Sequence, residues 1–232
     1  MHLLIPAAGV GKRMGSDRNK LLLPLLDQTI LAWTLGAAAA ANSIDWIGII
    51  CQDLDRPEIE AILAAQAPSV PVVLVEGGAS RQDSVYNGLE ALPPGATQVL
   101  IHDGARCLAT PALFDRCTAA LATCEGLIAA VPVKDTIKLV DAQQRIESTP
   151  DRSRLWAAQT PQGFGVERLR QCHQRGRDQG WAVTDDAALF EACGLPVQIV
   201  LGEETNLKVT TPVDLAIAAV ILQERDRRAI AT

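Results

Sequence analysis

A glycine-rich, strongly basic segment follows the first apolar run of the chain. It reads Pro6-Ala7-Ala8-Gly9-Val10-Gly11-Lys12-Arg13-Met14-Gly15. Lys12, Arg13, Arg18 and Lys20 place four cations within nine positions that hold one acid, Asp17. Small residues let the backbone approach a ligand closely, and successive N–H groups in such a loop can bind an anion. In a chain of net charge −6, this local excess indicates either a bound polyanion or a dense set of salt bridges.

The spacing of the glycines disfavours two common nucleotide-binding motifs. Glycines at positions 9, 11 and 15 give G-x-G-x-x-x-G, which misses the dinucleotide fingerprint of dehydrogenases by one residue. The segment is not a Walker A loop either, because Lys12 is followed by Arg13 and not by Ser or Thr. The alternative without a ligand is a glycine-rich turn with solvated charges.

A second glycine pair lies between an apolar run and the start of a predicted helix. Gly77 and Gly78 permit close backbone approach, and Ser84 is expected to face back toward the strand ends. Taken alone, the segment fits a glycine turn and helix cap equally well.

Polar residues also follow a third apolar run, at the end where open α/β sheets bind ligands. His102, Asp103 and Arg106 occupy these positions. An aspartate there can hold Mg²⁺ or a sugar hydroxyl, and an arginine can clamp a phosphate. The alternative is an Asp–Arg salt bridge that shapes the turn, and we expect His102 to be packed and not catalytic.

One further lysine stands near the C-terminal end of the chain. Lys208, in Asn206-Leu207-Lys208-Val209-Thr210, is a point charge directed to one face of a short strand-like run. Asp185 and Asp186 fall in the first turn of a predicted helix, where the macrodipole favours them, and we interpret them as structural.

Near-continuous apolar runs predict the strands that position these residues. The runs cover 3–6, 47–51, 70–75, 99–102, 127–133 and 197–201, as expected of parallel strands covered on both faces. Helical patterns alternate with them. The alternation predicts one doubly wound, mostly parallel α/β sheet with helices on both faces, and residues 1–232 are expected to form a single domain.

Three helix starts carry cap signals. Thr110 is followed by Pro111 at the first helical position, and Thr211 with Asp214 has the spacing of a capping box. Thr184 is expected to cap a helix that stops at Gly194. Apolar residues recur at helical spacing after Thr211 and predict a C-terminal helix: Val213, Ala216, Ile217, Val220 and Ile221.

The stretch from Lys134 to Thr149 departs from this alternation. Ile137 and Leu139 alternate with polar residues, and a second half-polar run follows a turn-like Asp-Ala-Gln-Gln. The pattern predicts a β-hairpin with too little apolar surface for a core. A lone two-stranded hairpin is marginal in water, which favours an arm at about 134–152 that pairs with another subunit over a simple surface hairpin.

Composition excludes several classes of protein. Hydrophobic residues make up 48% and charged residues 21%, and 27 acids against 21 Lys plus Arg argue against nucleic-acid binding. The six cysteines form no C-x-x-C pair and lie in apolar contexts, as reduced, buried thiols do. We find no signal peptide and no apolar run of membrane-spanning length, so we expect a soluble, cytoplasmic protein without membrane contact.

The motifs together resemble a known enzyme family. P-A-A-G-x-G-x-R-M-G at 6–15, with Lys20, is similar to the nucleotide-binding start of sugar-phosphate nucleotidyltransferases. Seven later motifs occur in the order seen in the 2-C-methyl-D-erythritol 4-phosphate cytidylyltransferases, and the resemblance runs from Leu3 to about Leu215. They are G-G-x-x-R-x-x-S-V at 77–85, H-D-x-A-R at 102–106, Asp135-Thr136-x-Lys138, Asp151-Arg152, Thr160-Pro161-Gln162, Thr184-Asp185-Asp186 and Asn206-x-Lys208-Val209-Thr210.

The resemblance implies a reaction and the residues that carry it. CTP and 2-C-methyl-D-erythritol 4-phosphate would give 4-diphosphocytidyl-2-C-methyl-D-erythritol and pyrophosphate, a step of non-mevalonate isoprenoid precursor synthesis. The implied CTP-binding residues are Ala7, Ala8, Gly9, Gly11, Gly78 and Ser84. The implied catalytic residues are Arg13 at the β/γ-phosphates, Lys20 at the α-phosphate, Arg152 and Lys208.

The resemblance also implies an acceptor site and an assembly. The polyol phosphate would contact Asp103, Arg106, Thr136 and Thr160, with Thr136 and Arg152 supplied by the partner's arm in a homodimer. Mg²⁺ is the implied cofactor, and Asp103 would contact the substrate or the Mg²⁺-bound triphosphate, through phosphate or water.

The chain departs from the family pattern at three positions that bear on function. Asn19 and Cys107 each stand where Pro is usual, and the first change predicts a less rigid loop before Lys20. Ala79 occupies a position that is often acidic, which weakens the expected selectivity for the base. Three other functions stay open: a cytidylyltransferase for another polyol phosphate such as ribitol 5-phosphate, a non-catalytic nucleotide-binding module, and a dehydrogenase.

Overall fold

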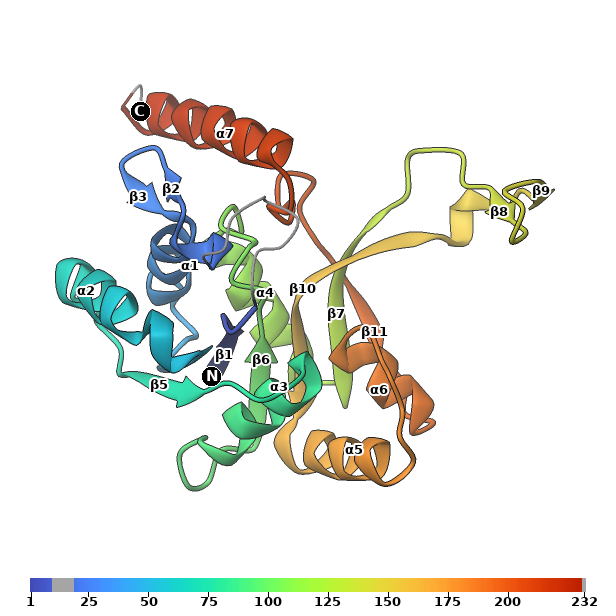
Figure 1. The fold of residues 1–232 in the computed structure, drawn as a ribbon, viewed down its shortest axis with the longest axis horizontal. Coiled ribbons are helices and arrows are strands. Elements are labelled where there is room, and N and C mark those ends of the chain that lie inside the picture. The colour runs from blue at the N-terminus through green and yellow to red at the C-terminus, as the bar shows by residue number, and fades with distance from the viewer. Residues whose placement is uncertain (10–18, 231–232) are drawn as a thin grey trace.

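The computed structural model describes residues 1–9 and 19–230, the last two of them as backbone only (Figure 1). Gly11 and Arg13, two of the expected site residues, lie outside the described residues. The strands are β1 (His2–Pro6), β2 (Pro24–Leu25), β3 (Gln28–Thr29), β4 (Trp46–Cys51), β5 (Val72–Glu76), β6 (Gln98–Ile101), β7 (Gly126–Pro132), β8 (Leu139–Val140), β9 (Ile146–Ser148), β10 (Trp156–Gly165) and β11 (Gln198–Leu201). The α-helices are α1 (Ile30–Ala39), α2 (Arg56–Gln66), α3 (Arg81–Glu90), α4 (Pro111–Leu121), α5 (Val166–Asp178), α6 (Asp186–Ala192) and α7 (Pro212–Ile230), with short 3₁₀ helices η2 (Lys20–Leu22), η3 (Asp53–Asp55) and η4 (Arg152–Arg154).

Seven strands form the central sheet in the order β11-β7-β10-β6-β1-β4-β5. Neighbouring strands are parallel except where β10 runs antiparallel between β6 and β7. All six predicted strands are present, but the sequence pattern does not predict β10. Proline is rare inside strands, and the ladder between β10 and β7 shifts register between Ala158 and Gln162, where Pro161 has no N–H to donate.

The two faces of the sheet bury separate cores. Along β1, Leu3 and Ile5 contribute to one core and Leu4 to the other, as the alternation of a strand requires. Side chains from α1, α2, α4 and α7 complete the first core, and those from α3, α5 and α6 complete the second (Figure 1). The predicted mostly parallel α/β sheet with helices on both faces is therefore confirmed.

Two of the three predicted helix caps are confirmed, and one is wrong by a residue. The Thr110 hydroxyl accepts from the Leu113 N–H at 3.2 Å, and Asp214 accepts from the Thr211 N–H at 2.8 Å in the predicted capping box. Asp185, and not Thr184, caps α6, because its carboxylate accepts from the Ala188 N–H at 2.9 Å. The helix ends before Gly194, whose φ is +76°.

The C-terminal helix predicted after Thr211 is present as α7. Val213 is 66% exposed and Val220 is 59% exposed, whereas Ala218 and Leu222 are buried. Of the periodic residues, Ile221 packs against the core, whereas Val213, Ile217 and Val220 are exposed. Periodicity alone does not tell which side of a helix meets the sheet.

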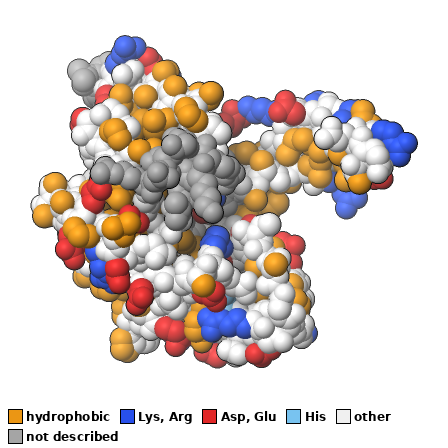
Figure 2. Space-filling model, viewed as in Figure 1, with side chains coloured by type: hydrophobic (Ala, Val, Ile, Leu, Met, Phe, Trp, Pro, Cys, Tyr) orange, Lys and Arg blue, Asp and Glu red, His pale blue; other side chains and the backbone are white. Residues whose placement is uncertain are grey.

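The predicted hairpin is present as β8 and β9, which pair antiparallel. It projects from the body on two legs that continue β7 and β10, joined at the base by a bond from the Val133 N–H to the Leu155 carbonyl at 3.0 Å (Figure 1). Figure 2 shows hydrophobic side chains along this arm, and the exposed ones are Ile137, Leu139, Val140, Ile146 and Trp156.

The remaining expectations concern cysteines and membranes. All six cysteines are free thiols, and Cys51, Cys107, Cys117 and Cys172 are buried. Across residues 1–9 and 19–230, no helix has both the length and the apolar character that crossing a membrane requires.

Candidate active site

A cavity of about 550 Å³ opens where β1, β4, β5 and β6 end. It lies at the edge where open α/β sheets bind ligands, and its volume is typical of small-molecule sites. The residues that line it include Ala8 and Gly9 after β1, Gln52 after β4, Gly78, Ala79, Arg81 and Ser84 after β5, and Asp103 after β6. Lys20 and Lys208 complete the lining from opposite ends of the chain.

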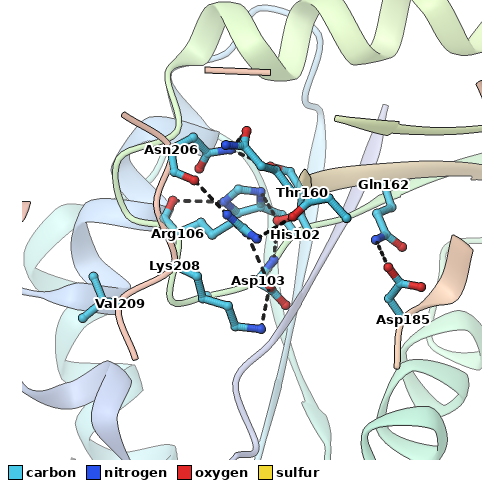
Figure 3. Close-up of polar contacts among 12 residues, drawn as sticks. His102, Asp103, Arg106, Thr160, Gln162, Asp185, Asn206, Lys208 and Val209 are labelled. Carbon is cyan, nitrogen blue, oxygen red and sulfur yellow. Dashed lines mark hydrogen bonds and ion pairs between the residues drawn. The ribbon is translucent and has the colours of Figure 1, made fainter. Parts of the chain in front are cut away.

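Two lysines bring positive charge into this cavity. The Lys20 Nζ donates to the Val209 carbonyl at 2.8 Å. The Lys208 Nζ lies 2.8 Å from the Asp103 Oδ2 (Figure 3). Two ammonium groups that are distant in sequence therefore line one cavity.

Asp103 is held ionised by its cationic neighbours. Burial alone would raise its pKa, but Lys208 and Arg106, with a smaller effect from Arg81, outweigh the burial and lower the pKa below 3.8. The Arg106 Nε lies 3.5 Å from the same carboxylate oxygen that Lys208 contacts. The Asp–Arg contact that the sequence analysis gave as the alternative exists, and the carboxylate also holds Lys208 in place.

His102 is packed beneath the site, as expected. It is fully buried, with its Nδ1 2.9 Å from the Thr160 hydroxyl and its Nε2 3.2 Å from the Arg106 carbonyl. Burial lowers the pKa of His102 to about 4, so the ring is neutral at neutral pH. A carbonyl only accepts, so Nε2 carries the proton and Nδ1 accepts from Thr160.

Buried amides hold the C-terminal segment against β10. The Asn206 amide donates to the Gln159 Oε1 at 3.2 Å and to the Thr160 carbonyl at 2.9 Å. The Arg106 guanidinium donates to the Asn206 carbonyl at 2.8 Å and to the Ala158 carbonyl at 3.2 Å (Figure 3). This network fixes the backbone two residues before Lys208. Sequence reasoning missed Gln159, because a lone amide has no spacing signal.

The segment after β5 is preorganised by Ser84. Its hydroxyl accepts from the Gly78 N–H at 3.0 Å and donates to the Ser80 carbonyl at 2.8 Å. A Cβ on Gly78 would collide with Asp83, so the close approach requires glycine. Ser84 thus faces back toward the strand ends, as expected, and it holds the glycine turn beside the cavity.

Arg81, which lines the cavity, pairs with a buried carboxylate behind it. The Arg81 Nη2 lies 2.8 Å from the Asp186 Oδ2, and the His173 Nε2 lies 3.3 Å from the Asp186 Oδ1. Asp185 caps α6 and accepts from the Gln162 amide at 2.9 Å (Figure 3). Both aspartates therefore have the structural contacts that the sequence analysis expected.

Comparison with known proteins identifies the family. A family model described as 2-C-methyl-D-erythritol 4-phosphate cytidylyltransferase matches residues 1–224. The chain belongs to this family. Two relatives bear the same name: one from Microcystis aeruginosa is 67% identical over 97% of this chain and 100% of its own length, and one from Nostoc punctiforme is 68% identical over 97% and 99%.

Solved structures of the cytidylyltransferase family agree with the fold. That of 4-diphosphocytidyl-2C-methyl-D-erythritol synthase from Anaerococcus prevotii has a TM-score of 0.86 at 32% identity and covers 96% of this chain and 95% of that one. That of 2-C-methyl-D-erythritol 4-phosphate cytidylyltransferase from Thermus thermophilus has a TM-score of 0.77 at 32% identity, covering 95% and 98%.

The structure brings together most of the residues that the cytidylyltransferase resemblance implies. Those that line the cavity are Ala8, Gly9, Lys20, Gly78, Ser84, Asp103 and Lys208. Ala7 lies beneath it, since its N–H donates to the Ile50 carbonyl at 2.7 Å and its carbonyl accepts from Asn19 at 2.6 Å. Arg106 and Thr160 adjoin it through their bonds to Asp103.

A single chain does not bring the arm residues to the cavity. Thr136 and Arg152 are exposed on the arm, which extends away from the body, and Arg152 donates to the Lys134 carbonyl at 2.9 Å (Figure 1). If these residues act in catalysis, a second copy of the chain must supply them.

Proposed function

We propose that this chain transfers the cytidylyl group of CTP to 2-C-methyl-D-erythritol 4-phosphate and releases pyrophosphate. The observation that carries the proposal is the convergence of Lys20 and Lys208 on one cavity in a chain of the cytidylyltransferase family. The reaction brings two polyanions together, so the first task of its site is to neutralise charge.

In this mechanism an oxygen of the acceptor phosphate attacks the α-phosphorus of CTP in line, and pyrophosphate leaves. Lys20 would contact the α-phosphate, where negative charge builds in the transition state, and Arg13 would contact the β/γ-phosphates. Lys208 would hold the acceptor phosphate, and Asp103, at 2.8 Å, directs its ammonium group. Phosphoryl transfer of this kind depends on positioning and electrostatics, so the chain needs no nucleophile of its own.

The nucleotide would lie across the ends of β1 and β5. Ala8, Gly9 and Gly11 would follow the ribose and phosphates, and Gly78 and Ser84 would meet the base. Ala7 would contribute indirectly, because both of its backbone groups are bonded within the chain. Arg106 and Thr160 would act at the acceptor beside Asp103.

The donor set of the cavity fits Mg²⁺ carried by the triphosphate. In the part of the chain that the structure describes, no group of three or more His, Cys, Asp or Glu side chains could hold a metal, and Asp103 is the carboxylate that lines the described cavity. Mg²⁺ suits such a site, since it keeps several waters and binds through one or two carboxylates and substrate phosphates. Asp103 would hold it directly or through water, and the ion would offset phosphate charge.

The proposed assembly is a homodimer in which each arm reaches the partner's cavity. The exposed apolar residues of the arm, such as Leu139 at 55% and Ile146 at 63%, need a covering surface. Covering them with a second copy would carry Thr136 and Arg152 to the acceptor phosphate of the other chain.

The test is pyrophosphate release from CTP, ATP, GTP and UTP, each with 2-C-methyl-D-erythritol 4-phosphate and with ribitol 5-phosphate. Release with CTP and the methylerythritol acceptor is the expected result. Faster release with ribitol 5-phosphate would assign the chain to another polyol phosphate. CTP binding without release from any pair would indicate a non-catalytic module, and tight NADPH binding would indicate a dehydrogenase.

A further inference from the structure

We infer that Asn19 is a positioning residue that fixes the backbone of Lys20, with Asp55 as its partner. The inference rests on the role proposed for Lys20 at the α-phosphate. Asn19 stands directly before Lys20, at a position where the loop was expected to be less rigid.

The Asn19 side chain is buried, at 6% exposure, and it joins three segments. Its Nδ2 donates to the Ala7 carbonyl at 2.6 Å and to the Asp55 Oδ2 at 2.8 Å. Its Oδ1 accepts from the Leu21 N–H at 3.1 Å and so caps η2. Both amide protons are used, and they tie the residue before Lys20 to the end of β1 and to the start of α2.

These bonds place the Lys20 side chain between two fixed points. Its backbone lies between Asn19 and Leu21, the two ends of the cap, and its ammonium group donates to the Val209 carbonyl at 2.8 Å. A charged group that is oriented before the ligand arrives needs no reorganisation when charge develops. Asn19 therefore acts on catalysis through Lys20 and does not itself line the described cavity.

The backbone angles of Asn19 provide a specific test of this role. Its φ is −60° and its ψ is 118°, a conformation that proline also adopts. Asn19→Pro keeps the backbone direction but removes all three side-chain bonds, whereas Asn19→Ala removes the bonds and leaves φ unrestrained. Comparing the two variants separates the backbone geometry from the side-chain bonds.

The experiment measures kcat and both KM values in the 232-residue protein, with rates normalised to folded protein. Asn19→Ala is expected to lower kcat about 10–100-fold, because a small misplacement of a catalytic group has effects of that size. The KM for CTP should change much less, since an interaction made in the transition state acts on kcat. Asn19→Pro is expected to keep a higher kcat than Asn19→Ala.

Matched controls come from the same chain. Asn42 also donates to a carboxylate, that of Asp115 at 3.2 Å, but at an exposed site, so Asn42→Ala should leave kcat unchanged. Asp55→Ala should lower kcat in the same direction as Asn19→Ala. Asp53→Ala, two positions before Asp55, removes an exposed contact with Arg56 and should leave kcat unchanged.

A second measurement does not depend on turnover. The rate at which an amine-reactive reagent modifies Lys20, followed by mass spectrometry, should rise in Asn19→Ala and stay unchanged in Asn42→Ala, because the bond to Val209 loosens. Wild-type kcat in Asn19→Ala would overturn the inference, whereas an equally low kcat in Asn19→Ala and Asn19→Pro would assign the effect to the side-chain bonds alone. Unchanged Lys20 modification with only a lower melting temperature would also overturn the inference. An inactive wild type would count against the proposed function, while the modification rates would still decide whether Asn19 positions Lys20.

Discussion

The Lys20 ammonium donates to the Val209 carbonyl at 2.8 Å across 189 positions of the chain. Val209 is itself buried, and its N–H donates to the Ala105 carbonyl at 2.9 Å, after the end of β6. The lysine therefore rests on an acceptor that the sheet holds in place. The segments around Lys20 and Val209 line one cavity together. A substitution in either segment is therefore expected to affect the position of the Lys20 ammonium group.

Removing the Lys20 ammonium should slow the reaction far more than it weakens binding. We predict that Lys20→Ala lowers kcat about 10²–10³-fold, by analogy with the loss of one preorganised transition-state donor. Steady-state pyrophosphate release measures the effect. Arg227→Ala, which removes an exposed cation paired with Glu224, serves as the charge control. A Lys20→Ala enzyme within a few-fold of wild type would contradict the assigned role.

Two inactive variants should restore activity when they are mixed, if the arm acts on the partner's cavity. Arg152→Ala removes an arm residue and Lys208→Ala removes a cavity residue. A mixed dimer holds one cavity with its own Lys208 and the partner's Arg152. Random exchange of equal amounts should therefore recover about a quarter of wild-type activity.

A double variant provides the negative control for the mixing experiment. The double variant with both Arg152→Ala and Lys208→Ala, mixed with either single variant, should recover no activity above that of the single variants. Failure of the two single variants to complement, with exchange verified by mass spectrometry, would place Arg152 outside the partner's site.

The buried His102 should make stability fall between pH 6.5 and pH 4. Burial lowers its pKa from 6.5 to about 4 in the folded protein, so the unfolded chain takes up a proton on acidification before the folded one does. Stability should therefore decrease as pH falls through this window, by up to about 3 kcal/mol. Urea unfolding at pH 7 and pH 5 measures it. The difference in the free energy of unfolding between pH 7 and pH 5 should be smaller in His102→Gln than in wild type, and an equal difference in both proteins would refute the assignment.

The Arg81–Asp186 pair should stabilise the fold at neutral pH and lose its effect in acid. Burial would raise the pKa of Asp186, but Arg81 and His173 lower it below 3.8. Its contribution is complete above pH 3.8 and is lost as pH falls through the lowered pKa. Asp186→Asn should destabilise the fold by about 1–3 kcal/mol at pH 7, because the Arg81 side chain, which is 33% exposed, loses its charged hydrogen-bond partner.

Urea unfolding from pH 7 down to pH 3 checks this prediction. The free energies of unfolding of wild type and Asp186→Asn should approach each other at the lowest pH. Asp226→Asn, on the exposed side of α7, should match wild type throughout. A constant gap between wild type and Asp186→Asn at every pH would show that the loss comes from packing and not from charge.

The sequence predicted the parts of the fold that depend on local pattern. Continuous apolar runs locate parallel strands, and Thr110 and Thr211 locate helix starts. The pattern missed β10, because Pro161 and Gly163 interrupt a strand that only its neighbours β6 and β7 stabilise. It located α7 but did not tell which side of the helix meets the core, since that depends on where the helix lies on the sheet.

The candidate site was predictable where motifs carry charge or glycine. Lys20, Asp103, Gly78 and Lys208 lie together as the motifs indicated. The contacts that hold them were not predictable, because Gln159 and Asn206 meet only after the chain has folded. Asn19 shows the same limit, since its three partners come from three separate segments.

The antiparallel strand β10 constrains how this protein can vary in length. One end of the strand is a leg of the arm, its middle holds Thr160 beside Asp103, and its far part carries Gln162, which binds Asp185. Because side chains alternate along a strand, a single insertion or deletion there would turn the residues on one side of the change, such as Thr160 or Gln162, to the opposite face of the sheet. Insertions are therefore expected to be tolerated in the arm tip or surface turns and rejected between residues 156 and 165, which can be scored in a library of one-residue insertions.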